Sequence, residues 1–265
     1  MLDYNLLKQR PFVIAGPCSA ESEDLCIEVA KFCSEVCKDH GFTYIFKASF
    51  DKANRTSINS YRGPGIEKGL RIFDRVKTKL NVPICTDIHT LGQPNLVSNI
   101  VDVIQIPAFL ARQTDLVIEA ALTGKIVNIK KPQFISYDKV KYIAEKCNDV
   151  GNNKLLLTER GNMYGASDLV VDFRNILEMK KYGYPVVIDS THSCQKMNSG
   201  GTTGGNREYA PYFAKAGFIF GATGLFAEVH KEPSKGLSDS ANMIDFKMFS
   251  DLIKDLKSMI TRDES

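Results

Sequence analysis

Residues 47–56 (KASFDKANRT) follow a short apolar run and bring together side chains that can bind an anion. Lys47, Lys52 and Arg55 are cations, and Asn54 and Thr56 add an amide and a hydroxyl group. An arginine guanidinium presents a rigid fork of donors that matches phosphate oxygens, while lysine supplies a point charge. A solvated basic loop is the alternative interpretation of this segment taken alone. Phosphate binding is favoured because similar residues recur elsewhere in the chain.

Short apolar runs alternate with helical patterns along the chain, and these elements must position the candidate residues. The runs expected to be strands are residues 12–15, 44–48, 83–87, 103–107, 126–130, 155–159, 185–189 and 218–222. Most are continuous rather than alternating, as expected of strands buried on both faces of a parallel sheet. Between them lie apolar stripes with helical spacing, such as the following: Ile66, Leu70, Phe73, Val76 and Leu80.

Eight strand–helix units in 265 residues predict an α/β fold, a (β/α)8 TIM barrel. We expect one domain over residues 1–265, with a short N-terminal extension before the first strand. A doubly wound open sheet is the competing fold. It is disfavoured because no GxGxxG motif follows the first strand.

Functional residues of such a barrel should follow the strands at the C-terminal face, and polar residues do follow nearly all of the predicted strands. The cations at these positions are Lys47, Lys52, Arg55, Arg112, Lys130 and Arg160. They exceed what one phosphate group requires. Their number therefore favours two anionic groups, which could belong to separate substrates.

A second set of residues is suited to a metal ion and follows the first, seventh and eighth predicted strands. Its members are Cys18, His192, Glu228 and Asp239. These strands are neighbours once a barrel closes, and a thiolate, an imidazole and two carboxylates suit Zn²⁺, Fe²⁺, Mn²⁺ or Co²⁺. The spacing alone is a weak signal, because no HExxH or CxxC motif supports it. His89 and His230 are alternative ligands.

Composition and charge exclude several functions. A net charge of +3 is too small to argue for nucleic acid binding. No segment approaches the roughly 20 apolar residues of a membrane span, and the first residues lack the order of a signal peptide. The seven cysteines are odd in number and form no CxxC pair. We expect a cytoplasmic protein that binds neither nucleic acid nor a membrane.

The glycine-rich residues 199–207 (SGGTTGGNR) do not form a phosphate-binding P-loop, because they lack the GK[ST] sequence. A connection without fixed structure is one interpretation. A lid that closes over the mouth of the barrel and excludes water is the other.

The longer motifs resemble those of 3-deoxy-D-manno-octulosonate 8-phosphate synthase (KDO8P synthase), over nearly the whole chain. They are GPCSAES, FKASFDKANRTSINSYRGPG, IQIPAFLARQTDL, VNIKKPQF, TERG, DSTHS and EVHKEPSKGLSDSANM. The resemblance implies a homotetrameric barrel that condenses phosphoenolpyruvate with D-arabinose 5-phosphate and water and releases inorganic phosphate. The product would serve lipopolysaccharide synthesis, or a cell-wall sugar in plants.

The resemblance also implies a role for each residue at a matching motif position. The phosphate of phosphoenolpyruvate is expected on three groups: Lys130, Arg160 and the backbone of Ala108. Its carboxylate and reacting carbons are expected beside four side chains: Lys47, Lys52, Gln105 and Gln133. The sugar is expected on three residues, the last two at its phosphate: Asn54, Arg55 and Thr56. The side chains expected to act in catalysis are Lys47, Lys52, Asp87 and His192.

Two further features follow from the resemblance. The family has metal-requiring members with Cys in the first loop and metal-independent members with Asn there, and this chain has Cys18. A divalent ion is therefore expected on four ligands: Cys18, His192, Glu228 and Asp239. Arg112 is expected to reach a sugar phosphate bound in a neighbouring subunit.

Three alternative functions remain open. DAHP synthase, which uses erythrose 4-phosphate, typically has KPRTS where this chain has KANRTS, and Asn54 can bond a hydroxyl group of a longer sugar. Sialic acid synthase is a more distant relative with an extra domain. The non-enzyme alternative is a barrel that binds a phosphosugar without catalysis.

Overall fold

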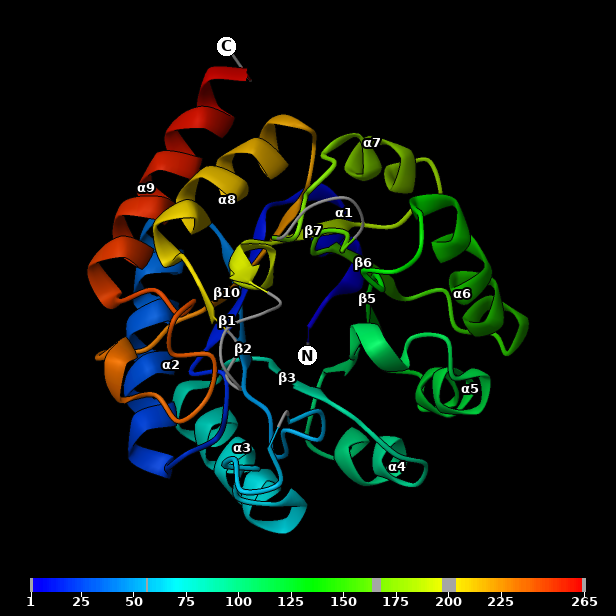
Figure 1. The fold of residues 1–265 in the computed structure, drawn as a ribbon, viewed down its shortest axis with the longest axis horizontal. Coiled ribbons are helices and arrows are strands. Elements are labelled where there is room, and N and C mark those ends of the chain that lie inside the picture. Colours follow the sequence, from blue (N-terminus) through cyan, green and yellow to red (C-terminus); the bar gives the residue numbers. More distant parts are fainter. Residues whose placement is uncertain (1, 56, 164–167, 197–203, 264–265) are drawn as a thin grey trace.

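The computed structural model describes residues 2–55, 57–163, 168–196 and 204–263, and side chains as far as residue 260 (Figure 1). Eight parallel strands close into a barrel, and helices surround it (Figure 1). Around the barrel the strands follow the order β1-β10-β7-β6-β5-β4-β3-β2. Each strand thus pairs with its neighbours in the sequence, and β1 pairs with β10 to close the ring. The predicted (β/α)8 barrel is confirmed.

The barrel strands are β1 (Phe12–Gly16), β2 (Thr43–Lys47), β3 (Ile84–Asp87), β4 (Val103–Ile106), β5 (Ile126–Lys130), β6 (Leu155–Glu159), β7 (Val186–Asp189) and β10 (Gly224–Glu228). The α-helices are α1 (Tyr4–Gln9), α2 (Glu23–Asp39), α3 (Ile66–Leu80), α4 (Gln93–Ser98), α5 (Thr114–Leu122), α6 (Tyr137–Asp149), α7 (Arg174–Lys180), α8 (Ala210–Ile219) and α9 (Phe246–Asp263). The short elements are the hairpin β8 (Gln195–Lys196) with β9 (Gly204–Gly205), and the 3-10 helices η1 (Ala108–Leu110), η2 (His192–Cys194), η3 (Arg207–Tyr209) and η4 (Pro233–Lys235).

The eighth predicted strand is wrong, because residues 218–222 form the end of α8 and the turn after it. Gly221 has a φ of +88° and ends the helix. The amide of Gly221 donates to Phe218 and that of Ala222 to Gly217, which satisfies two of the last helical carbonyls. The apolar character of 218–222 thus comes from a helix face. The eighth strand, β10, begins two residues later.

The inside of the barrel is filled below its mouth by apolar side chains. This inner core consists of Leu7, Phe12, Ile14, Ile45, Cys85, Val103, Ile126, Leu156, Val187 and Phe226. Leu7 comes from α1, the helix that precedes β1, and contributes to the inner core from outside the strands. Residues two apart on a strand share one face, so the side chains that follow the inner core on each strand also point inward. Those positions hold Lys47, Asp87, Asp189 and Glu228.

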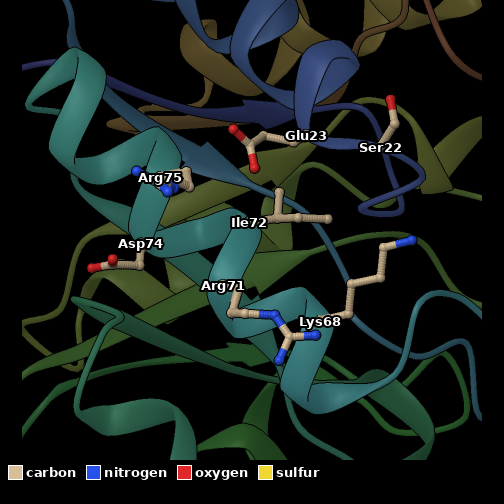
Figure 2. Close-up of a pocket in the computed structure, with 7 residues that line it drawn as sticks. All are labelled: Ser22, Glu23, Lys68, Arg71, Ile72, Asp74 and Arg75. Carbon is tan, nitrogen blue, oxygen red and sulfur yellow. The ribbon is translucent and has the colours of Figure 1, made fainter.

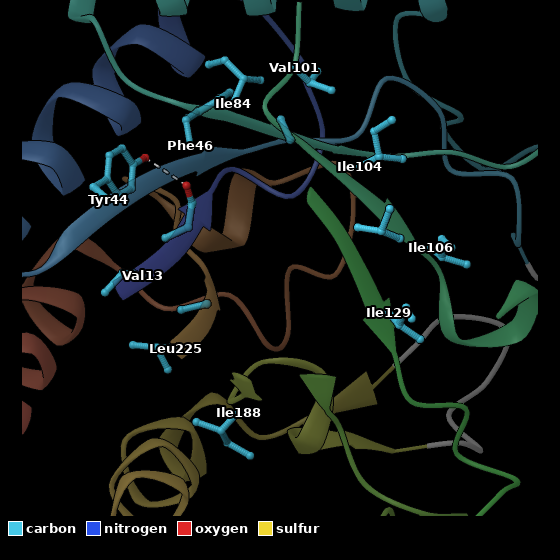
Figure 3. Packing of buried hydrophobic residues seen from close by; sticks show 14 of the residues in the cluster. Val13, Tyr44, Phe46, Ile84, Val101, Ile104, Ile106, Ile129, Ile188 and Leu225 are labelled. Carbon is cyan, nitrogen blue, oxygen red and sulfur yellow. Dashed lines mark hydrogen bonds between the residues drawn. The ribbon is translucent and has the colours of Figure 1, made fainter. Parts of the chain in front are cut away.

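A second core lies between the strands and the surrounding helices (Figure 3). Tyr44 on β2 is buried in it, and its hydroxyl group donates to the carbonyl of Ala15 at 2.9 Å (Figure 3). On α2, the cysteines Cys26, Cys33 and Cys37 are buried here, as their helical spacing predicts. They act as small core residues.

The predicted helical stripe from Ile66 to Leu80 lies in α3. In α6 an apolar stripe is fully buried: Val140, Ile143, Ala144 and Cys147. One apolar face is what a helix on the outside of a barrel needs. Within the described residues, no helix combines the length and the apolar character needed to cross a membrane.

Candidate functional site

The lysine that ends β2 lies in a buried network with a carboxylate from β3. Lys47 Nζ donates to Ser49 Oγ at 2.9 Å and lies 3.6 Å from Asp87 Oδ1, to which Ser49 also donates. His89 Nε2 lies 3.0 Å from Asp87 Oδ2. Burial would raise the pKa of Asp87, but Lys47 and His89 outweigh it and hold the pKa well below its usual value. Two predicted site residues, Lys47 and Asp87, are therefore in contact.

A second buried pair joins β5 to β7. Lys130 Nζ donates to Asp189 Oδ2 at 2.6 Å and lies 3.2 Å from the centre of the Phe226 ring. His192 Nδ1 lies 2.8 Å from the same Asp189 oxygen. Burial would raise the pKa of Asp189, but the attraction of His192 and Lys130 outweighs it and lowers the pKa. Asp189 thus orients a predicted phosphate ligand and a predicted metal ligand together.

The candidate metal ligands converge at the ends of β1 and β10. Ligand atoms of Cys18, Glu228 and Asp239 all lie within 4.8 Å of one another, and Cys18 Sγ lies 3.6 Å from Asp239 Oδ2. His192 Nε2 lies 3.8 Å from Glu228 Oε1. Three of the four predicted ligands are therefore brought together, and the fourth, His192, adjoins the cluster through Glu228. His89 and His230, the alternatives, contact Asp87 and the backbone amide of Glu232 instead.

The chemistry of this cluster fits a divalent cation. Glu228 is 1% exposed, and both its carboxylate oxygens lack a hydrogen-bond partner among the described residues. Burial and the charge of Glu228 raise the pKa of the Cys18 thiol. A buried carboxylate without donors is costly unless a cation balances it, and a bound metal ion would also stabilise the thiolate. A thiolate, imidazole and carboxylate set suits a borderline-soft ion such as Zn²⁺ or Fe²⁺.

The backbone at two of these ligands has an unusual conformation. Cys18 has a φ of +65° and Asp239 a φ of +47°. Residues other than glycine rarely adopt this left-handed region, and Asn and Asp tolerate it best. The local structure has to bear the strain of this conformation at two residues whose ligand atoms lie within 4.8 Å of those of Glu228.

Arg160, which follows β6, is linked to the metal cluster by one side chain. Arg160 Nη2 donates to Gln195 Oε1 at 2.7 Å, and Gln195 Nε2 donates to Asp239 Oδ1 at 3.2 Å. Arg160 is 6% exposed, and its Nη1 lacks a protein acceptor among the described residues. A buried guanidinium with a free donor is suited to an anion such as phosphate.

The predicted sugar-binding residues lie on the loop after β2. Arg55 Nε donates to the carbonyl of Tyr61 at 3.0 Å, and its Nη2 donates to Ser238 Oγ. Ser238 adjoins Asp239, so this arginine is held beside the metal cluster. Asn54 is exposed, and Thr56 lies outside the described residues. Lys52, which precedes them, lies 4.0 Å from Glu228 Oε1.

The remaining predicted residues follow β4 and β5. Gln105 is buried and its Oε1 accepts from Asn128 at 3.2 Å. Gln133 is buried as well, and its Oε1 has no donor within the described chain, which leaves it available to a ligand. Ala108 begins η1, and Arg112 is exposed after it. An exposed Arg112 is compatible with its predicted role at a neighbouring subunit, which stays a prediction. Of the glycine-rich residues 199–207, residues 199–203 lie outside the described residues, and the rest form β9 and the start of η3.

A separate hollow of about 570 Å³ lies on the outer wall, between the start of α2 and α3 (Figure 2). Its lining consists of Ser22, Glu23, Lys68, Arg71, Ile72, Asp74 and Arg75. None of the predicted site residues lines it. The hollow carries charges of both signs, whereas the predicted site requires a set of cations. We therefore place the site in the mouth of the barrel, where the predicted residues meet.

Several residues of the site were not predicted. Asp189 occurs in the DSTHS motif, but no role was expected for it beyond its place at a strand end. Ser49 and Gln195 carry no signal in sequence, because serine and glutamine are common in loops. Phe226 belongs to an apolar run, and only the barrel geometry shows that its ring lies beneath Lys130.

Comparison with known proteins agrees with this geometry. A sequence profile of the DAHP synthetase I family matches residues 7–262. The chain belongs to the DAHP synthetase I family. Curated members from Fusobacterium nucleatum and a Cyanothece species are 49% and 47% identical to it over 93% and 91% of this chain, and over 89% of each relative. A member from Shewanella denitrificans is 44% identical over 96% of this chain and 90% of its own length.

All three relatives in the DAHP synthetase I family are named 2-dehydro-3-deoxyphosphooctonate aldolase, which is KDO8P synthase. The resemblance that the motifs indicated is confirmed. The names do not favour the alternative of a DAHP synthase within the same family.

Proposed function

We propose that this chain condenses phosphoenolpyruvate with D-arabinose 5-phosphate and water, and forms 3-deoxy-D-manno-octulosonate 8-phosphate and inorganic phosphate. The observation that carries the proposal is the set of buried cations in the mouth: Lys47, Lys130 and Arg160 are 2%, 4% and 6% exposed. Buried charges need partners, and Arg160 Nη1 has no acceptor within the described part of the chain. The names of relatives at 44–49% identity support the choice of substrates.

Lys130 and Arg160 are proposed to hold the phosphate of phosphoenolpyruvate, with the backbone at Ala108. Lys47 and Lys52 are proposed to face its carboxylate. Positive groups fixed before the reaction stabilise the charge that develops on these anions without reorganising. Holding two anionic substrates together also removes much of the entropic cost of joining them.

The reaction forms one carbon–carbon bond and one carbon–oxygen bond, and it breaks the carbon–oxygen bond to phosphate. C3 of phosphoenolpyruvate attacks the aldehyde carbon of the sugar, and water adds to C2 and loses a proton, which the aldehyde oxygen gains. The C2–O bond to phosphate then breaks, and the released phosphate takes the proton of the new C2 hydroxyl group, which becomes the ketone. Asp87, held by Lys47, Ser49 and His89, is proposed to contact the sugar near this aldehyde.

Four side chains are proposed to hold a divalent ion: Cys18, His192, Glu228 and Asp239. When bound, Zn²⁺, Fe²⁺, Mn²⁺ or Co²⁺ would supply a Lewis acid that binds water or orients the aldehyde. This assignment is supported by the two buried carboxylate oxygens of Glu228, which accept no hydrogen bond from any described residue.

We also propose that Asn54, Arg55 and Thr56 bind the sugar and that the protein is a cytoplasmic homotetramer. In that assembly Arg112 would reach the sugar phosphate in a neighbouring mouth. The exposure of Arg112 and the resemblance of its motif support this arrangement.

An assay that offers D-arabinose 5-phosphate and erythrose 4-phosphate in parallel tests the function. We expect phosphate release from phosphoenolpyruvate with the five-carbon sugar. Turnover of erythrose 4-phosphate alone would overturn the proposal in favour of a DAHP synthase. Tight binding of the sugar without phosphate release would favour a binding protein.

A further inference from the structure

Each of the two proposed phosphate ligands has a charged neighbour in the sequence whose side chain points the opposite way. Lys130 points into the barrel, while Lys131 points away from it. Arg160 points into the mouth, while Glu159 points outward. Lys131 Nζ and Glu159 Oε1 lie 3.4 Å apart, and both side chains are 0% exposed. A buried ion pair therefore joins the ends of β5 and β6 directly behind the two cations.

Glu159 is bonded to the turn that carries Arg160. Its Oε1 accepts from the amides of Arg160 at 2.9 Å and Gly161 at 2.7 Å. Its Oε2 accepts from Asn175 Nδ2, in α7, at 2.9 Å. The φ of Gly161 is +92°, a conformation that this turn can adopt because the residue is glycine. Glu159 thus fixes the direction in which the chain leaves β6, and with it the start of the Arg160 side chain.

Lys131 holds the other side of the same turn. Its Nζ donates to Asn162 Oδ1 at 2.7 Å and lies 3.4 Å from the carbonyl of Gly161. Its backbone amide donates to Thr158 at 2.8 Å. The ammonium, the carboxylate and the turn therefore form one connected buried network in the described structure. Such networks restrict their members to one geometry when every polar group has a partner.

We infer that Lys131 and Glu159 form a positioning pair that sets the distance and direction between Lys130 and Arg160, so that both reach one phosphate. This inference rests on the proposed function for the identity of the phosphate. Stability is a weak explanation for the pair, because apolar residues of similar volume often replace a buried ion pair at no cost. Neither residue of the pair touches the substrate, so each acts through its neighbour.

Glu159→Gln tests the inference, because it keeps the shape and the acceptor oxygen but removes the charge. We expect inorganic phosphate, measured by calorimetry, to bind about 10-fold to 100-fold more weakly, as misplacement of a binding group by about 1 Å can cost that much. The KM for phosphoenolpyruvate should rise similarly, while the KM for arabinose 5-phosphate stays within about twofold. Lys131→Arg should retain near-normal phosphate affinity, and Lys131→Met should lose it.

Lys77→Met is a control for loss of a lysine–carboxylate ion pair away from the site, because Lys77 pairs with Asp102 at 2.8 Å just before β4, at the opposite end of the barrel, although its side chain is 38% exposed. It should lower the melting temperature and leave phosphate affinity unchanged. If Glu159→Gln lowers only the melting temperature, the pair is structural and the inference fails. If that variant does not fold, Asn175→Ala is the alternative, because it keeps the ion pair but removes the hydrogen bond to Glu159 Oε2. It should weaken phosphate binding to a smaller extent. Unchanged affinity in this variant would also contradict the inference.

The phosphate titration separates this inference from the proposed function. Wild-type protein that binds phosphate but turns over neither sugar would refute the proposed reaction, and the Glu159→Gln comparison would still test the positioning pair. Normal turnover with unchanged affinities in Glu159→Gln and Lys131→Met would refute the positioning pair alone.

Discussion

The ammonium group of Lys130 lies 3.2 Å from the centre of the Phe226 ring. The same ring lies 5.6 Å from Lys47 Nζ and 5.7 Å from the His192 ring. An aromatic face attracts a cation most strongly where water is excluded, and Phe226 is fully buried. The Phe226 ring therefore packs against two lysines and a histidine, which come from three different strands or loops.

Replacing Phe226 by Leu should weaken substrate binding more than folding. We expect the free energy of unfolding to fall by about 1 kcal/mol, a typical cost for a core substitution. The KM for phosphoenolpyruvate should rise about 5-fold to 30-fold, since loss of a buried cation–π contact is worth about 1–2 kcal/mol. Thermal unfolding and initial rates measure the two effects.

Phe12→Leu is the control for this variant. Phe12 belongs to the same inner core and is fully buried, but its ring packs against Gly224 rather than a lysine. It should cost similar stability and leave the KM unchanged. Equal changes in KM for the two variants would show that Phe226 only fills space.

Binding of phosphoenolpyruvate should weaken above pH 8. Burial lowers the pKa of Lys130 to about 8, although the neighbouring Asp189 raises it. Below that pH the ammonium is charged and can attract phosphate; as pH rises through 8 the free protein loses this charge. A bound phosphate raises the pKa again, so binding at pH 9 should take up a proton.

Calorimetry in two buffers with different ionisation enthalpies measures this proton uptake directly. The observed enthalpy should depend on the buffer at pH 9 and hardly at all at pH 7. Lys130→Arg offers the comparison, because a guanidinium remains charged over this range. A wild-type affinity that is constant between pH 7 and 9.5 would contradict the prediction.

Cys18→Asn should remove the metal ion without destabilising the metal-free protein. The backbone at Cys18 is left-handed, with a φ of +65°, and Asn adopts this conformation more readily than most residues. Metal analysis should give clearly less than one ion per chain for the variant. Unfolding of the chelator-treated proteins should give equal or higher stability for Asn.

Cys18→Val provides the contrast in the same metal-free comparison. A β-branched residue in left-handed backbone costs about 1–2 kcal/mol, so this variant should be the least stable of the three. If wild-type protein holds no divalent ion after purification with Zn²⁺ or Fe²⁺ present, the metal assignment is wrong. Full activity of metal-free wild type would lead to the same conclusion.

Mixing two inactive variants should restore activity if Arg112 serves a neighbouring subunit. In Arg112→Ala protein, no mouth would receive an arginine from a neighbouring subunit. In Lys130→Met protein, each subunit's own mouth would be inactive, but its Arg112 would remain. Under the proposed assembly, hybrid tetramers would contain intact mouths whose Arg112 comes from the other variant. Phosphate release from the mixture, after subunit exchange, should exceed the sum of the separate variants. No gain in hybrids confirmed by native mass spectrometry would place Arg112 outside the site.

Most of the barrel could be predicted from the sequence, because seven of its strands are short apolar runs, most of them continuous, and polar residues follow nearly all of them. The eighth was misplaced because the face of α8 and β10 are both apolar and lie a few residues apart. Only the left-handed Gly221 separates them, and its conformation is not apparent before the helix is placed.

Some residues of the site can likewise be predicted from the sequence, and others cannot. Long motifs identify residues such as Lys130 and Glu228, whose chemistry is visible in their type. The groups that hold them, such as Ser49, Glu159 and Phe226, act through distance and direction. These depend on which face of a strand is turned inward, and a single residue type does not reveal it.

Leu7 and Phe12 fill the barrel at the end opposite its mouth. Substrates and products therefore reach and leave the site through the mouth. Lys130 is almost completely enclosed at 4% exposure, whereas Asn54 is exposed beside the opening. Under the proposed function, a sugar seated at Asn54 would block the way to Lys130. Phosphoenolpyruvate must then arrive first, and the phosphate it leaves behind must depart last. A site with a single opening thereby fixes the order in which substrates bind and products leave.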